Sequence, residues 1–112
     1  MNKNIIKVYH AHQDGYHHVA NVNIEGVEGN EEDLLEYAYA VTNNVTFSWS
    51  KVSKDCEEYN PRVEVIGLGH MERGYRSTSV NDAMGLGFQA WVVKSCCFQK
   101  EEFPIVKQEW FR

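Results

Sequence analysis

Apolar and polar residues alternate along two neighbouring stretches near the N-terminus, residues 5–12 and residues 16–25. A period of two is typical of β-strands, because successive side chains of a strand point to opposite faces. Asp14 and Gly15 lie between the stretches, and an Asp-Gly pair favours a two-residue type I′ turn with positive φ at both positions. The pattern therefore predicts a β-hairpin.

A turn centred on Asp14 and Gly15 also determines which residues of the hairpin face each other. The expected pairs are His12 with His17, Tyr9 with Ala20, and Ile5 with Ile24. The face expected to join the core carries Ile5, Tyr9, Ala11, Ala20, Val22 and Ile24. We expect the other face to be polar and partly solvated, because it carries His10, His12, His17, Asn21 and Asn23.

The clearest helical pattern in the chain spans residues 30–44, NEEDLLEYAYAVTNN. Asn30 is a favourable N-cap residue, and the acidic residues that follow it occupy the first turn, where the helix dipole stabilises negative charge. The apolar residues Leu34, Ala38 and Val41 recur at the spacing of one helical stripe. We expect the helix to end at Asn43 and Asn44.

The C-terminal half of the chain predicts further strands. Residues 62–68, RVEVIGL, predict a short strand, and residues 88–98, FQAWVVKSCCF, predict a central one because they are rich in β-branched and aromatic side chains. Residues 103–112 are expected to form an edge strand or a packed tail. This order of elements predicts an α+β fold, a small antiparallel β-sheet with one main α-helix packed on a face. We expect one globular domain over residues 1–112.

Charge is distributed unevenly along the chain, which has a net charge of −5. No Lys or Arg occurs between Val8 and Ser50. Six acidic residues of this stretch, here called the acidic segment, are Glu25, Glu28, Glu31, Glu32, Asp33 and Glu36. Such a segment repels the phosphates of nucleic acids, so it is typical either of a solvated face or of a surface that binds a basic partner.

The cysteine content and the distribution of apolar residues indicate the cellular compartment. The chain has three cysteines, an odd number, which we interpret as reduced thiols. No stretch approaches the roughly 20 apolar residues of a membrane span, and the N-terminal residues MNKNIIKVYH lack the long apolar run of a secretory signal. We therefore expect a cytoplasmic protein that does not bind membranes.

Residues 76–82, RSTSVND, invite a catalytic interpretation because they are rich in hydroxyl groups. A phosphate-binding loop would need several glycines, a lysine and a following helix, and a nucleophilic serine would need a base and a G-x-S-x-G setting. Asn81 instead tolerates positive φ, and Asp82 can accept hydrogen bonds from nearby backbone amides. The segment therefore predicts a tight turn that leads into a strand from Ala83, without catalytic residues.

The helix and this turn together resemble the YodL-like small domains of tailed phages and conjugative elements. Those domains have a helix that contains Leu-Glu and ends in Asn, then Ser-x-Ser-Val-Gly-Asp, then a strand that ends in Gly-Phe or Cys-Phe. The matching residues are Leu35, Glu36, Asn43 or Asn44, Arg76, Ser77, Ser79, Val80, Asp82 and Phe98. Asn81 replaces the usual Gly, and Ala83-Met84 stands where β-branched residues are common. The resemblance implies a setting in a mobile element, and it implies no particular reaction.

Among all side chains, the histidines are the strongest candidates for metal binding or catalysis. Under the predicted register His10, His12 and His17 gather on one hairpin face, and three imidazoles suffice for a zinc site with an open position. A longer turn would shift the register and scatter them. A polar face remains the first interpretation, and we expect no cofactor, no bound metal and no catalytic residue.

We therefore expect a non-enzymatic protein that binds a host protein with a basic surface, such as a nucleic-acid-handling or defence enzyme, and modulates or inhibits it. The partner-binding residues would be the acidic segment together with Trp49 as an aromatic anchor. The first alternative is a metal-binding module, or a metal-dependent enzyme, that uses the hairpin histidines. Direct nucleic-acid binding is a weaker alternative, because its basic candidates, Lys51, Lys54, Arg62, Arg73 and Arg76, alternate with acids.

Overall fold

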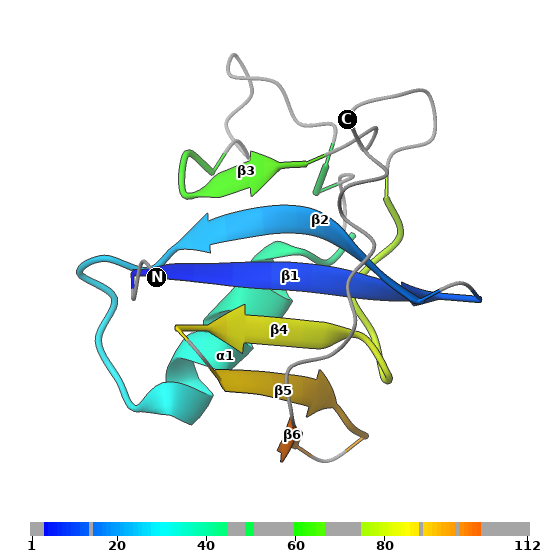
Figure 1. Cartoon of the computed structure of the whole chain (residues 1–112). Coiled ribbons are helices and arrows are strands. Elements are labelled where there is room, and N and C mark those ends of the chain that lie inside the picture. The colour runs from blue at the N-terminus through cyan, green and yellow to red at the C-terminus, as the bar shows by residue number, and fades with distance from the viewer. Residues whose placement is uncertain are drawn as a thin grey trace.

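The fold was described from a computed structural model, which covers residues 4–13, 15–44, 49–50, 60–66, 75–87, 89–95 and 97–101. The elements in chain order are β1 (Ile5–His12), β2 (Gly15–Asn23), α1 (Glu31–Val41), β3 (Val63–Val65), β4 (Ala83–Leu86), β5 (Gln89–Val93) and β6 (Phe98–Glu101). The six strands form one sheet in the order β3-β2-β1-β4-β5-β6, and every neighbouring pair is antiparallel. Helix α1 crosses one face of this sheet (Figure 1). The predicted α+β class is present, and the sheet dominates it.

The predicted N-terminal hairpin is present, but its register was wrong. Strand β2 begins at Gly15, which pairs with His12, whereas the sequence pattern had paired His12 with His17. Tyr9 pairs with His18 instead of Ala20. The register also shifts between Val8 and Tyr9, because β2 carries one extra residue at this point. Ile5 consequently pairs with Asn23 instead of Ile24.

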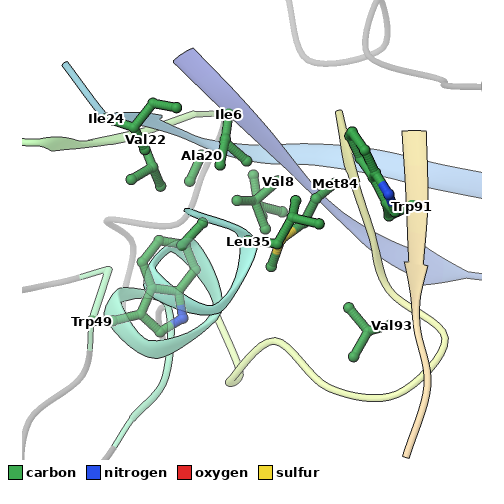
Figure 2. Close-up of a cluster of buried hydrophobic side chains, with 12 residues drawn as sticks. Ile6, Val8, Ala20, Val22, Ile24, Leu35, Trp49, Met84, Trp91 and Val93 are labelled. Carbon is green, nitrogen blue, oxygen red and sulfur yellow. The ribbon is translucent and has the colours of Figure 1, made fainter. Parts of the chain in front are cut away.

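The predicted face assignment of the hairpin is confirmed only in part: Tyr9, Ala20, Val22 and Ile24 are buried as expected, but the opposite face of β1 is the one that packs against α1. Ile6, Val8 and Met84 belong to the hydrophobic cluster beneath α1, together with Ala20 and Val22 of β2 (Figure 2). Since side chains alternate along a strand, His10 shares the face of Ile6 and Val8. His10 is 1% exposed, so the predicted solvated histidine face is in part buried.

Helix α1 begins at a complete capping box. The Asn30 side chain accepts the Asp33 N–H at 2.9 Å, and the Asp33 carboxylate accepts the Asn30 N–H at 3.1 Å. Each interaction satisfies a backbone N–H that the first helical turn leaves without an intrahelical partner. The helix ends at Val41, with Thr42 as its C-cap, slightly before the predicted stop at Asn43 and Asn44.

Leu35, Ala38 and the cap residue Thr42 form the buried stripe of the helix region. Their spacing of three and four residues places them on one side of α1, which faces the sheet. Leu34, which was expected in the central stripe, is only partly buried, and so is Val41. Figure 2 shows Leu35 directed into the cluster toward Val8 and Met84.

The C-terminal strands differ from the prediction in one respect. Of the predicted strand over residues 88–98, residues 89–93 form β5. The chain then turns, with a hydrogen bond from the Lys94 N–H to the Cys97 carbonyl, and β6 begins at Phe98 and pairs antiparallel with β5. The predicted strand from Ala83 is confirmed as β4. Residues 103–112, where an edge strand or tail was expected, lie outside the described residues. None of the helices in the described part of the chain is long and apolar enough to cross a membrane.

Candidate functional site

The RSTSVND segment contains the predicted turn. The Asp82 N–H donates to the Ser79 carbonyl at 3.0 Å, which closes the turn, and Asn81 has a φ of 82°. The Asn81 N–H donates to the Val93 carbonyl at 2.8 Å, so the turn is also tied to β5. The chain then enters β4 at Ala83, as the sequence indicates.

Asp82 is the centre of this turn and is fully buried. Its carboxylate accepts the Ser79 N–H and the Ala11 N–H, each at 2.8 Å. It also accepts two hydrogen bonds from the Arg76 guanidinium, at 2.7 and 2.8 Å. Ala11 lies in β1, so this one carboxylate both shapes its own turn and fastens the turn to the central part of the sheet.

A second set of contacts connects the segment to the end of α1. The Thr42 hydroxyl donates to the Ala38 carbonyl at 2.8 Å, and the Thr78 hydroxyl donates to the Thr42 hydroxyl at 2.8 Å. The Thr78 oxygen therefore has to accept from His10 Nε2, which lies 3.0 Å away. The chain of donors thus places the proton of the neutral His10 ring on Nε2.

This arrangement places a hydroxyl, an imidazole and a carboxylate close together, but in the wrong geometry for nucleophilic catalysis. In a catalytic triad the carboxylate binds one ring nitrogen, and the other nitrogen takes the proton of the hydroxyl. Here the Thr78 hydroxyl and the Asp82 carboxylate both lie near His10 Nε2, at 3.0 and 3.9 Å. Since that nitrogen carries the proton, it cannot act as a base toward Thr78. Thr78 is also 1% exposed.

The pKa shifts agree with a structural role for these groups. Burial lowers the pKa of His10 to about 4, although the nearby Asp82 carboxylate acts in the opposite direction. Burial acts to raise the pKa of Asp82, but the hydrogen bonds from Arg76, Ala11 and Ser79 outweigh it and leave this pKa below its usual value. The imidazole is thus neutral and the carboxylate charged at neutral pH.

Trp49 is a core residue, which corrects its predicted role as a surface anchor. Its side chain is 9% exposed, stacks on Tyr75 with ring centroids 5.8 Å apart, and donates its indole N–H to the Arg76 carbonyl at 2.8 Å. Its ring also meets His10 edge-on at 6.2 Å. Trp49 therefore holds the RSTSVND segment against the core, and most of its side chain is covered.

The acidic segment, by contrast, lies on the surface. All six of its acidic side chains, Glu25, Glu28, Glu31, Glu32, Asp33 and Glu36, are exposed. Within the described residues none of them forms an ion pair with Lys, Arg or His. Arg62 approaches the segment, but its guanidinium donates to the Asn23 and Glu25 carbonyls and not to a carboxylate. Of the six, Asp33 also serves the helix cap.

The hairpin histidines are brought together only in part. His12 and His17 stack with ring centroids 4.2 Å apart, while His10, the direct strand partner of His17, has its Nε2 engaged with Thr78. Within the described residues no group of three His, Cys, Asp or Glu side chains is placed to hold a metal ion. The three-histidine arrangement that the sequence analysis considered as an alternative is therefore not formed by these residues.

Three residues that surround His10 were not predicted to contribute to the structure: the buried Thr42 and Thr78, and the partly buried Tyr75. Their contacts join positions far apart in the chain, such as the hydrogen bond between Thr42 and Thr78, 36 residues apart. A local sequence pattern carries no signal for such pairs. The other members of the predicted turn are placed as follows: Ser77 accepts the Asn44 N–H through its hydroxyl at 2.7 Å, and Val80 is exposed.

The comparisons with known proteins do not indicate a family or a function for this chain. No family model matches the chain, and no curated protein and no solved structure is significantly similar to it.

Proposed function

We propose that this chain is a small acidic accessory protein of a phage or mobile element, which binds a basic surface of a host protein and modulates or inhibits that protein without catalysis. The phage or mobile-element setting is implied by the sequence resemblance. The contact with a basic surface is supported by one observation, the exposure of all six acidic side chains of the acidic segment.

The geometry of the segment favours recognition by charge. Glu25 and Glu28 lie in the connection between β2 and α1, and the other four acids lie in the first turns of the helix. The capping box fixes where the helix starts, so these carboxylates are presented from a defined backbone. A compact region of one charge accelerates association with an oppositely charged surface and discriminates against partners of like charge.

In this proposal the RSTSVND segment has a structural role and does not bind the partner. The polar groups of Asp82, Thr78 and Thr42 are all engaged inside the molecule, and His10 is neutral. Among the described residues no buried side-chain nitrogen or oxygen lacks a hydrogen-bond partner. A buried network whose polar groups are satisfied internally rigidifies the fold.

Affinity capture with charge-reversed variants tests this function. The sequence suggests reversing Glu31, Glu32 and Asp33, but Asp33 belongs to the helix cap, so its replacement would also damage α1. The variant E32K/E36K reverses two exposed helix positions and keeps the cap. The untagged protein is immobilised, incubated with lysate of the cell that carries the gene, and the captured proteins are identified by mass spectrometry.

A matched control is E64K/E101K, which changes the net charge by the same amount at exposed positions on β3 and β6. The proposal expects a captured protein with a basic surface that is lost with E32K/E36K and retained with E64K/E101K. Equal capture by all three proteins, or equal loss with both variants, would refute the acidic segment as the binding surface.

A further inference from the structure

Three buried apolar residues of the sheet lie outside the core beneath α1. Tyr9 is 1% exposed and Ala83 and Ala90 are fully buried, yet none of them belongs to the hydrophobic cluster that includes the helix. Their strand neighbours Val8 and Met84 do belong to that cluster. Since successive side chains of a strand point to opposite faces, Tyr9 and Ala83 lie on the face of the sheet that α1 does not cover.

The strand pairing places these residues side by side. Tyr9 of β1 pairs with Ala83 of β4, and Ala90 of β5 pairs with Gly85, which follows Ala83 on the same face of β4. Residues that pair directly in an antiparallel ladder are neighbours on one face. Tyr9, Ala83, Gly85 and Ala90 are all buried and form one patch across three adjacent strands, here called the second-face patch.

A buried patch in the middle of a sheet needs a second layer of chain above it. An antiparallel sheet can leave one face open to water, and a tyrosine ring on an open face would be partly solvated. Helix α1, the only helix of the described residues, lies on the other face, and Trp49 and Tyr75 contact His10 on that same side (Figure 1). Tyr9 is nevertheless buried within a single chain, and this burial raises its pKa to about 12. The cover must therefore come from elsewhere in the same chain.

We propose that residues 102–112, which follow β6, pack across the second-face patch and cover Tyr9. Residues 51–59 carry five charged side chains and residues 67–74 contain three glycines, so neither segment offers a continuous apolar surface. Residues 102–112 are richer in large apolar side chains than either segment. These are Phe103, Pro104, Ile105, Val106, Trp110 and Phe111.

The position of β6 places the start of this segment beside the patch. Strand β6 ends at Glu101, which pairs with Ala90. Strands β5 and β4 lie between β6 and β1, so three strand spacings, roughly 14 Å in total, separate the start of the segment from the strand of Tyr9. An extended chain advances about 3.3 Å per residue, so about five residues reach Tyr9 and the whole segment can cross the patch.

The second-face patch and the acidic segment lie on opposite sides of the sheet, because four of the six acids belong to α1. Cover of Tyr9 and capture of a basic partner are consequently independent properties, and each can fail without the other.

Acetylation of tyrosines by N-acetylimidazole in the full chain, with peptide mapping by mass spectrometry, tests this cover. The variant I105S/V106S/W110S/F111S should raise the reaction rate of Tyr9 by at least about tenfold, because a covered side chain reacts only while its cover is open. The matched control E102S/K107S/Q108S/E109S changes four polar positions of the same segment and should leave the rate near that of the wild type. Tyr75, on the side of α1, should keep its wild-type rate in both variants, which separates local uncovering from unfolding.

NOE spectra of the wild-type full chain give a second readout that does not depend on how well a variant folds. The Tyr9 ring and the Ala90 methyl group should show cross-peaks to apolar side chains of residues 103–111. Cross-peaks from Tyr9 to residues 51–59 or 67–74 instead, or to a second copy in isotope-filtered spectra, would overturn the proposal. An equal Tyr9 reaction rate in the wild type and the apolar variant, or an equal increase in both variants, would do the same.

Discussion

The Asp82 carboxylate and the Arg76 guanidinium form a two-fold hydrogen-bonded ion pair, at 2.7 and 2.8 Å, in which the carboxylate is buried and the guanidinium is 46% exposed. The pair alone does not explain why a charge is buried here. The same carboxylate also accepts two backbone N–H groups, from Ser79 and from Ala11. The carboxylate thus accepts four N–H groups, and because one of them belongs to Ala11 of β1, it links the turn to the sheet.

Replacement of Asp82 should therefore be costly. D82A leaves two partly buried N–H groups and one half-exposed guanidinium without their acceptor, and the loss of hydrogen bonds to a charged group costs about 1.5–3 kcal/mol of unfolding free energy. Urea denaturation followed by tryptophan fluorescence measures this change. S79A is the control, because the exposed Ser79 hydroxyl has one long contact, 3.4 Å from Arg76, and should change stability by less than about 0.5 kcal/mol. A D82A loss no larger than that of S79A would contradict the assigned role.

His10 makes the stability depend on pH. Its pKa in the folded state is about 4, against an ordinary value of 6.5, so between these pH values the unfolded chain binds a proton that the folded chain does not. Stability should therefore fall as the pH decreases from about 6.5 to about 4, by on the order of 3 kcal/mol. Comparison of the pH dependence of urea denaturation for wild-type protein and H10Q isolates this contribution. The same slope in both proteins would show that His10 is not the group responsible.

Because Asn81 has a positive φ, we expect the glycine variant at this exposed position to be more stable than the valine variant. Glycine adopts a φ of 82° without strain, so N81G should stay within about 1 kcal/mol of the wild-type stability. N81V places a β-branched side chain in the left-handed region and should lose about 1–2 kcal/mol. Thermal unfolding of the two variants measures the difference. Equal stability of N81G and N81V would mean that the turn does not hold this conformation in solution.

The helix cap supports the acidic segment, and its loss should be measurable. N30A removes the acceptor of the Asp33 N–H and should destabilise the protein by about 1 kcal/mol. E36A, on an exposed position of the same helix, should change stability by less than half of that amount. The measurement is urea denaturation with helix content followed by circular dichroism. If the cap is unimportant, the two variants will unfold at the same urea concentration.

The elements of this fold could be read from local patterns. Strand β1 has the predicted bounds of residues 5 and 12, and Asn30 caps α1 as its position before three acids indicates. The turn at Ser79–Asp82 followed from the backbone preferences of Asn81 and Asp82. These features depend on neighbours in the chain, which is why a single sequence is sufficient for them.

The pairing of the hairpin could not be read in the same way. Both faces of β1 carry apolar residues, and both are buried: Val8 is 0% and Tyr9 1% exposed. Alternation alone therefore does not decide which face meets the helix. The extra residue of β2 near Val19 has no local sequence signal either, and it changes every later pair, including those of His10 and His17.

The buried network was missed for a different reason. His10 and Thr78 are 68 residues apart, and a polar residue in an amphipathic strand is more often solvated than buried against a hydroxyl. The end of β5 at Val93 shows the same limit, because Lys94 and Ser95 interrupt a β-rich run without glycine or proline. Tertiary contacts decide both features.

The association rate at increasing salt concentration tests the central claim, recognition of a basic partner through the acidic segment, most directly. With the captured partner immobilised, the wild-type rate constant should fall steeply between low and physiological ionic strength, because salt screens charges that attract each other. E64K/E101K should show nearly the same dependence, and E32K/E36K a slower association with a much weaker dependence. Identical salt dependence in all three proteins would contradict the claim.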